Sequence, residues 1–222
     1  MTQDHTSPVA DKPSRKQQQR SIVTQQKLLD AAIAAFSENG FKGTSTRDIA
    51  ERAGVHHPLI TYHFKNKDQL WRAAADRVFR DFRRSLAASL EDHQKESPKQ
   101  RMASMIRAYV YYAKSQPALH KVIVQEASYP SPRLDWLVET HLKPFFDASF
   151  AMFTELQALD IAVKGNPRLL FNMIRLSSGG LLALGQELQV SSGIDVNDDA
   201  TLDEIADLIV SVFLPGKMPP TD

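Results

Sequence analysis

The chain has 222 residues, of which 42% are hydrophobic, so it can bury a core without covalent cross-links. It contains no cysteine, which excludes disulfides, thiolate zinc sites and cysteine nucleophiles. The net charge of +1 is unevenly divided, because residues 1–67 carry 10 Lys and Arg against 6 Asp and Glu, whereas residues 68–222 carry 17 against 20. A basic end joined to a mildly acidic remainder indicates that this end meets a polyanion.

The hydrophobic pattern predicts an all-α fold of about nine helices and no strand. The chain has only 9 glycines, and most of its 12 prolines lie where helices would begin or end. No stretch approaches the roughly 18 apolar residues of a membrane span, and the polar N-terminus lacks the hydrophobic core of a signal peptide. We therefore expect a cytoplasmic protein with no membrane contact.

The first predicted elements are an arm and two helices. Residues 1–19 are polar and aperiodic, which predicts a disordered basic arm that either follows phosphates or only adds solubility. Over residues 20–39, apolar side chains recur at spacings of three and four, and Gly40 follows as a stop. Ser45 can cap the next helix, with Asp48 three residues later in a capping-box-like arrangement.

A third short helix is predicted to begin near His57, with Pro58 in its first turn, where a missing N–H costs nothing. The second and third helices can cross steeply, because Ala50 makes a small contact and Gly54 tolerates a positive φ in the turn. This spacing fits a helix-turn-helix over residues 45–64, whose outer helix would enter the major groove of DNA. It fits an ordinary tight αα-corner equally well, so spacing alone leaves both interpretations open.

The amino-acid sequence from residue 40 to residue 70 is a more specific signal than the helix spacing alone. Residues 40–50 read Gly-Phe-Lys-Gly-Thr-Ser-Thr-Arg-Asp-Ile-Ala, residues 53–55 read Ala-Gly-Val, and residues 60–70 read Ile-Thr-Tyr-His-Phe-Lys-Asn-Lys-Asp-Gln-Leu. Together they resemble the DNA-binding domain of the TetR family of transcription regulators.

The resemblance implies a DNA-binding head over residues 20–66 and a helical effector-binding and dimerisation body over residues 67–222. It further implies a ligand-responsive repressor without a cofactor, which binds a palindromic double-stranded DNA operator as a homodimer and is released by a small molecule.

Matched position by position, the resemblance also implies which side chains contact DNA. They come from the second helix, the third helix and the start of the fourth: Thr46, Arg47, His57, Pro58, Thr61, Tyr62, His63 and Lys67. Thr61 departs from the family pattern, because many members have an aromatic residue there.

The three histidines of this segment raise the question of a metal site. His56 and His57 are adjacent, so they point about 100° apart on a helix, and no carboxylate joins them at ligand spacing. We expect no metal here.

The body is predicted to consist of six further helices. They start near residues 67, 97, 116, 132, 166 and 201. The fourth of these, over residues 132–159, is expected to bend at Pro144, and the last is expected to open with a capping box formed by Thr201 and Glu204.

The body carries no nucleophile elbow and no phosphate-binding glycine loop. We interpret His120 and His141 as hydrogen-bonded structural histidines and expect no enzymatic activity. A helical ligand-binding or catalytic dimer with a vestigial DNA head remains the alternative.

By resemblance, a small-molecule effector of unknown identity would lie between the body helices, lined by apolar side chains with a few polar anchors. The residues predicted to line this site are Met105, Tyr109, Trp136, Phe146, Phe150, Asn172 and Arg175. The last two helices, about 167–188 and 201–214, are predicted to form the homodimer interface, because the first is rich in small residues and the second has an apolar stripe. Burial of these helices within one subunit is the alternative.

Overall fold

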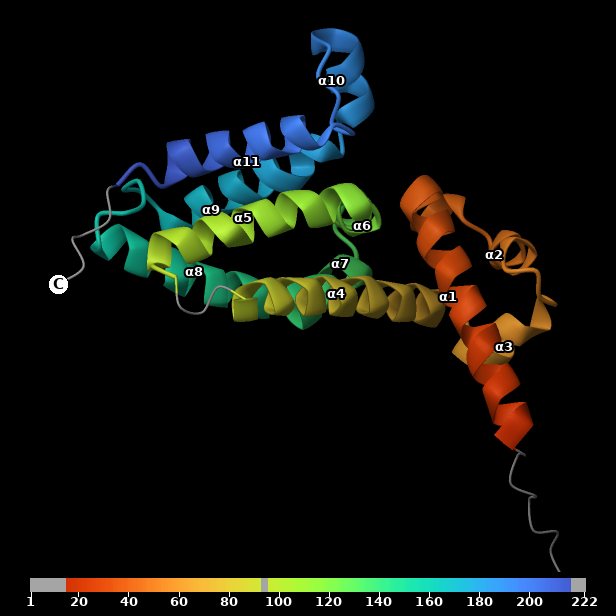
Figure 1. Ribbon diagram of the computed structural model, residues 1–222. Coiled ribbons are helices and arrows are strands. Elements are labelled where there is room, and N and C mark those ends of the chain that lie inside the picture. The colour runs from red at the N-terminus through yellow and green to blue at the C-terminus, as the bar shows by residue number, and fades with distance from the viewer. Residues whose placement is uncertain (1–14, 93–95, 217–222) are drawn as a thin grey trace, which may run out of the picture.

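The computed structural model describes residues 15–92 and 96–216, and within these ranges it contains helices and no strand. A group of three helices, here called the head, lies to one side of a larger helical body (Figure 1). The head consists of α1 (Arg15–Gly43), α2 (Thr46–Arg52) and α3 (Pro58–Phe64). The body consists of α4 (Lys67–Asp92), α5 (Pro98–Ser115), α6 (Ala118–Ala127), α7 (Pro132–Leu137), α8 (Lys143–Ala158), α9 (Pro167–Arg175), α10 (Gly185–Ser192) and α11 (Asp199–Phe213). The predicted all-α class is confirmed.

Two π-helical turns lie inside longer helices. The first, η1 (Val138–Leu142), joins α7 to α8, and Pro144 follows in the first turn of α8. A π-helical turn therefore lies directly before Pro144, the residue at which a bend was predicted and which has no N–H to donate. The second, η2 (Leu176–Gly180), extends α9.

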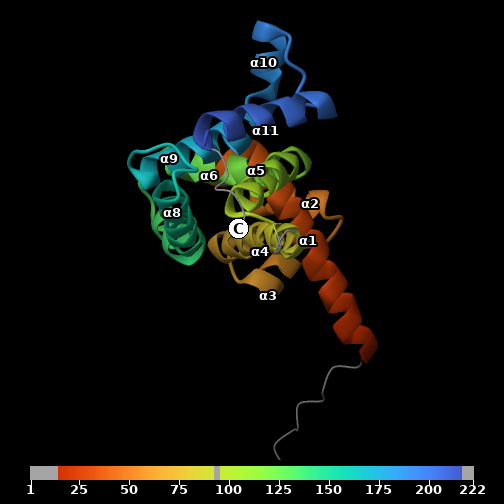
Figure 2. The same ribbon diagram turned by 60° about the vertical axis from the view of Figure 1, so that its left-hand side comes forward.

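The described residues form ten continuous helices, whereas about nine were expected. The helix predicted over residues 166–188 is wrong, because it is interrupted at 183–184 and α10 begins separately. Gly185 lies close to Val196, where a Cβ would come within 2.5 Å of the valine Cγ2. The chain can therefore fold back at this glycine, and α10 stands away from the other helices in two views (Figures 1 and 2).

Two further boundaries differ from the prediction. Helix α1 begins at Arg15, so residues 15–19 are helical and not disordered, while residues 1–14 lie outside the described residues. Arg, Lys and Gln favour helix and extend α1 beyond its apolar contacts. Helix α11 is capped by Asp198, whose carboxylate accepts a hydrogen bond from the Thr201 amide at 3.1 Å. The predicted Thr201 capping box is wrong, because the preceding aspartate already serves the free amides of the first turn.

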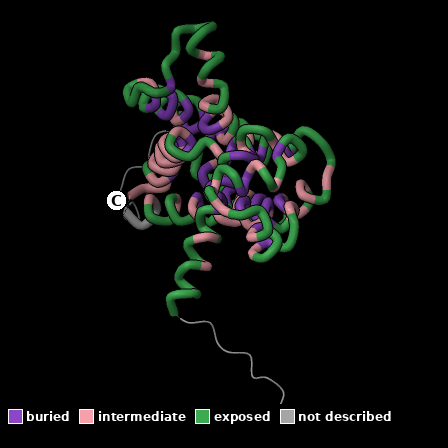
Figure 3. The backbone as a smooth tube through the Cα atoms, turned by 90° about the vertical axis from the view of Figure 1, so that its right-hand side faces the viewer, coloured by how far each residue is buried: buried purple, intermediate pink, exposed green. Residues whose placement is uncertain are grey.

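The head shares its hydrophobic core with the body. One buried cluster runs from Leu28 and Phe36 in α1 through Trp71 in α4 to Leu119 in α6. A second cluster joins α5 and α8 to α9 and α11. In Figure 3 the buried residues lie between the helices, whereas α10 and the first turns of α1 are exposed. The predicted boundary between head and body, at residues 66 and 67, therefore lies between two helices. The head and the body do not have separate hydrophobic cores.

None of the helices in the described ranges combines the length and the apolar character needed to cross a bilayer.

Candidate nucleic-acid interface and internal cavity

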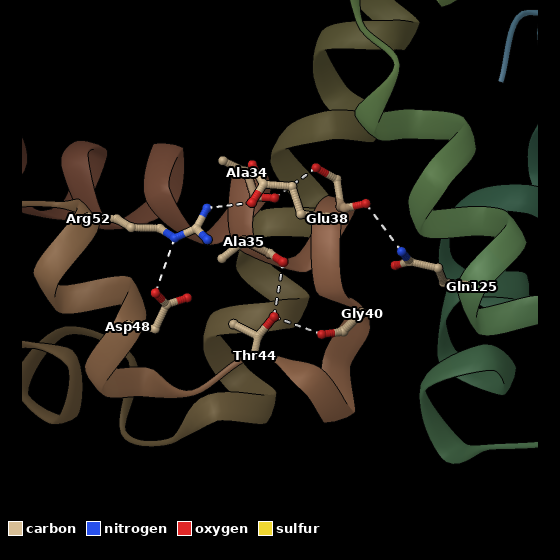
Figure 4. A network of polar contacts seen from close by, with 9 residues as sticks. Ala34, Ala35, Glu38, Gly40, Thr44, Asp48, Arg52 and Gln125 are labelled. Atoms are coloured by element: carbon tan, nitrogen blue, oxygen red, sulfur yellow. Dashed lines mark hydrogen bonds and ion pairs between the residues drawn. The ribbon is translucent and has the colours of Figure 1, made fainter. Parts of the chain in front are cut away.

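Helix α2 begins at a capped N-terminus. Ser45 is extended, with φ −104° and ψ 152°, and its Oγ accepts a hydrogen bond from the Asp48 amide at 3.0 Å. The predicted cap at Ser45 is thus confirmed, but the reciprocal half of the capping box is not. The Asp48 carboxylate instead accepts from Arg52 Nε at 3.2 Å, and Arg52 also pairs with Glu38 of α1 at 2.7 Å (Figure 4). These ion pairs tie α2 to α1.

The kink at the end of α1 is held by a threonine that the sequence analysis did not single out. Gly40 ends the regular helix with φ 68° and ψ 177°, as predicted. The buried Thr44 hydroxyl lies 3.0 Å from the Ala35 carbonyl and 2.8 Å from the Gly40 carbonyl (Figure 4). Since a kink leaves carbonyls without helical partners, a hydroxyl at this position stabilises it.

The turn between α2 and α3 has the expected geometry. Gly54 has φ +62°, a conformation that residues with a side chain rarely adopt. A Cβ there would meet no atom within 4 Å, so glycine is favoured by the backbone conformation and not by a lack of space. Ala50, Ile49 and Ile60 are buried in the angle between the helices. The remaining side chains of α3 are thereby turned outward.

Six of the predicted DNA-contacting residues lie on the outer side of the head. Arg47, His57, Pro58, Thr61 and Tyr62 are exposed, and 75% of Tyr62 is accessible. The half-buried Thr46 places its Oγ1 2.9 Å from His57 Nε2, which joins the start of α2 to the start of α3. A large aromatic with this exposure has no role in the core of the protein.

The other two predicted contacts, His63 and Lys67, are half-buried. The His63 ring lies edge-on to Tyr62 with centroids 4.9 Å apart, and burial lowers the pKa of its imidazole. Lys67 Nζ lies 4.4 Å above the Phe41 ring, and burial, followed by the nearby charge of Arg133, lowers its pKa. Over residues 15–92 and 96–216, no three His, Asp or Glu side chains come together to hold a metal ion.

Helix α6 connects the head to the body. Gln125 Nε2 donates a hydrogen bond to the Ser37 carbonyl in α1 at 3.2 Å (Figure 4). From α4, Arg77 pairs with Asp30 of α1 at 2.7 Å. The guanidinium of Arg133 lies 3.7 Å above the Phe41 ring. Several directed contacts therefore fix the orientation of α1 on α4 and α6.

The body contains two adjoining small cavities, with room for about 10 Å³ and 40 Å³. They share four lining residues, Phe82, Tyr109, Phe145 and Arg175. The first reaches α6 at Leu119 and Ile123, and the second extends to methionines of α5 and α8. Their mostly apolar lining is typical of small-molecule sites, but a ligand larger than a water molecule or two must displace the surrounding side chains to enter.

Four of the seven predicted lining residues border these cavities: Met105, Tyr109, Phe146 and Arg175. Trp136 does not, because it packs edge-on against Trp71, with centroids 5.8 Å apart, near the head. Phe150 lies one layer out, against Phe146 and Phe171. Asn172 hydrogen-bonds to Arg175 instead of facing the cavity, with Oδ1 accepting from Nη2 at 3.2 Å.

Several lining residues were not predicted as such. Phe79 and Phe82 of α4 and Phe145 of α8 border the first cavity. Each lies on an apolar helical stripe of the kind that also forms ordinary core, so periodicity does not distinguish the two. Only the packing of several helices around one space identifies them.

The two body histidines differ from each other. His141 is hydrogen-bonded as predicted, with Nε2 2.7 Å from Asp76 Oδ1 and Nδ1 3.1 Å from Arg83 Nη1. His120 is not, because its buried Nε2 has no hydrogen-bond partner among the residues that the structure describes. Its ring fills the space left at Gly179 in η2, where a Cβ would lie 1.8 Å from Nε2. Burial, and then the charge of Arg175, lower the pKa of His120 to about 4.

An apolar stripe covers the outer side of α9, η2 and α11. Leu169, Met173 and Leu176 are half or more exposed and follow one another at spacings of four and three. Leu208 and Val212 of α11 are exposed to a similar degree. Exposed apolar side chains thus lie on the two segments predicted to form the dimer interface, and others lie at Val124 of α6 and Val190 of α10.

The family described as bacterial regulatory proteins, tetR family, matches residues 28–74, which span most of the head and the start of α4. RutR of Escherichia coli strain K12, an HTH-type transcriptional regulator, is 23% identical over 201 residues, covering 90% of this chain and 93% of RutR. Residues 28–74 are therefore a TetR-type DNA-binding domain, and the chain is a transcriptional regulator with a helix-turn-helix head.

Other relatives of this regulator match shorter stretches. The regulator AcrR of Shigella flexneri is 41% identical over 58 residues, which cover 26% of this chain and 27% of AcrR. The probable regulator YttP of Bacillus subtilis is 23% identical over 121 residues, and the match spans 58% of its length. These relatives are all transcriptional regulators.

Solved structures share the fold of this chain. AibR, determined with isovaleryl coenzyme A and operator DNA, matches with a TM-score of 0.67 at 16% identity, over 86% of this chain and 98% of AibR. FadR of Bacillus subtilis, determined with stearoyl-CoA, matches with a TM-score of 0.63 at 22% identity, over 84% of this chain and 97% of FadR. The order of head and body helices is therefore that of known regulators.

Proposed function

We propose that this regulator is a homodimeric repressor that leaves a palindromic operator when a small molecule fills the body cavities. The observation that carries the proposal is the position of α6. This helix lines the first cavity with Leu119 and Ile123, and it holds α1 of the head through Gln125. A ligand that displaces α6 therefore changes the position of the head.

The DNA-contacting role of α3 rests on the exposure of its side chains. Pro58, Thr61 and Tyr62 lie opposite the buried Ile60 and Phe64. We assign Arg47, Tyr62 and their predicted neighbours to base and phosphate contacts in the major groove. AibR, whose structure was determined with operator DNA, supports this use of the fold.

The dimer is proposed from the apolar stripe on α9, η2 and α11. In a two-fold dimer the same surface serves both partners, so one self-complementary stripe is sufficient. Two heads held by one interface present their α3 helices at a fixed separation. Only one such separation matches successive turns of the major groove, so a ligand that favours another separation weakens operator binding.

The experiment first selects operator sequences from a random double-stranded DNA library with the intact protein. It then measures their affinity by fluorescence anisotropy. We expect a palindromic consensus, and we expect Arg47→Ala and Tyr62→Ala each to weaken specific binding about tenfold or more. Arg168→Ala, which removes an exposed arginine of the body, is the matched control and should bind as the unchanged protein does. Selection of no sequence, or full binding by both head variants, would show that α3 does not read DNA.

A further inference from the structure

Arg175 is a cation at the meeting point of two cavities, the first of which is also lined by Arg83 and by His141, its hydrogen-bond partner, whereas the second is otherwise apolar except for Tyr109. Arg175 lines both of them. Its Nε and Nη2 donate to Asn172 Oδ1 at 3.4 and 3.2 Å, and its guanidinium lies 5.5 Å from the Phe146 ring. No carboxylate of residues 15–89 and 96–216 forms an ion pair with it. The amide of Asn172 orients this cation but does not neutralise it.

A second donor lies beside it. The Tyr109 hydroxyl makes no hydrogen bond within the described part of the chain, although the ring borders both cavities. Burial raises the pKa of Tyr109, while the charge of Arg175 acts in the opposite direction, so the hydroxyl keeps its proton and feels the guanidinium. The same charge acts on the neighbouring His120, whose ring centroid lies 5.4 Å from that of Tyr109.

The rest of the second cavity is apolar. Apart from Tyr109 and Arg175, its lining consists of aliphatic, methionine and phenylalanine side chains, including Leu86, Met105 and Met152. Methionines adapt to ligands of varied shape, and such walls offer nothing to a second polar group. A partly buried cation in these surroundings is stabilised by an anion that shares the site.

We propose that the effector is an amphipathic carboxylic acid, with its carboxylate on Arg175 and its hydrocarbon part in the cavity lined by Met105 and Met152. Tyr109 donates a second hydrogen bond to the carboxylate. This inference rests on the proposed function only in taking the cavities as the effector site. It commits to a free carboxylate, and not to a thioester whose charge lies outside the cavity.

Binding is measured by calorimetry with octanoate, decanoate, dodecanoate and cinnamate, each paired with its methyl ester and the corresponding alcohol. We expect at least one acid to bind about tenfold to a hundredfold more tightly than its ester or alcohol, which is the range of a charge-assisted hydrogen bond. Arg175→Gln should remove that preference and Arg175→Lys should retain part of it. Arg168→Gln, in the same helix but exposed, should change nothing. Circular dichroism establishes that each variant is folded.

Some outcomes overturn the proposal. Esters that bind as tightly as acids, or decanoyl-CoA that binds more tightly than decanoate and is unaffected by Arg175→Gln, would place the charge elsewhere. Operator release distinguishes this inference from the proposed function. An acid that binds through Arg175 without releasing DNA supports the carboxylate site and contradicts effector-driven release. A ligand that releases DNA but whose affinity is unchanged by Arg175→Gln supports effector-driven release and contradicts the carboxylate site.

Discussion

The head and the body of this regulator place their polar side chains in opposite ways. The head turns Arg47, Tyr62 and their neighbours outward from two short helices whose inner faces are buried. The body encloses Arg175, Tyr109 and His120 among aromatic and aliphatic side chains contributed by several helices. A polyanion as large as DNA requires an open, rigid surface, whereas a small molecule is held by enclosure. The two sites are joined through α6 and a shared hydrophobic core.

The largest expected effect on operator binding comes from separating the two subunits. Leu208→Glu together with Val212→Glu adds charge to the exposed stripe of α11 without altering the buried face of that helix. We expect a folded monomer whose operator affinity falls about a hundredfold or more, because each head must then bind its half-site alone. Light scattering after size-exclusion chromatography reports the mass, and anisotropy reports the affinity.

Leu159→Glu is the control for this experiment. It introduces the same charge at a residue that is also exposed but lies at the end of α8, away from the stripe. A double variant that remains dimeric would assign the interface to another surface.

A neighbouring pair of glycines tests the packing between α6 and η2. Gly179→Ala places a methyl group where His120 Nε2 would be 1.8 Å away, so the ring or the π-helical turn must move. We expect a loss of about 1–3 kcal/mol in the free energy of unfolding, as for other overpacked cores. Gly180→Ala is the matched control, since its Cβ would lie 3.4 Å from the nearest atom, the Leu176 Cδ2. It should be neutral or raise stability by up to about 1 kcal/mol. Equal effects in urea titrations would contradict the close approach of His120.

The last prediction concerns the pH dependence of stability, with an expected effect of the same order as that of Gly179→Ala. The folded-state pKa of His120, about 4, lies below its ordinary value of 6.5, so the folded protein binds fewer protons than the unfolded chain. Stability is therefore complete above pH 6.5 and falls as the pH decreases towards 4. Between pH 7 and pH 5 this group costs about 2 kcal/mol of unfolding free energy, and His120→Gln should remove that part of the slope. A variant whose urea midpoints fall with pH as steeply as those of the unchanged protein would assign the acid sensitivity to other groups.

The head was largely predictable because its signals are local. Ser45 caps a helix three residues from the amide that it binds, and Gly40 and Gly54 act through their own backbone angles. The two predictions that failed nearby, the return half of the capping box and the start of α1, involve side chains with a choice of partners. Asp48 pairs with Arg52, and the polar residues 15–19 extend a helix that needs no core.

The cavity was only half predictable, because its members are far apart in sequence. Phe79 and Phe145 follow the same helical periodicity as Trp136, yet the first two line a cavity and the third packs at the junction with the head. Asn172 was predicted as a ligand anchor because it is polar, but it lies one turn from Arg175 and bonds to that side chain. Local spacing reports which face of a helix is buried and not which helix lies opposite.

The sequence by itself determined the helical class and the TetR-type helix-turn-helix, since caps, turn glycines and amphipathic spacing act over a few residues. The tertiary structure decided where α9 gives way to α10, which aromatics enclose empty space, and that His120 is left without a partner beside Gly179. The cavity lining and the surroundings of His120 depend on contacts between residues 50 or more positions apart, such as His120 with Gly179, and the start of α10 depends on the contact of Gly185 with Val196. No local pattern encodes such distances, because they follow from how whole helices pack.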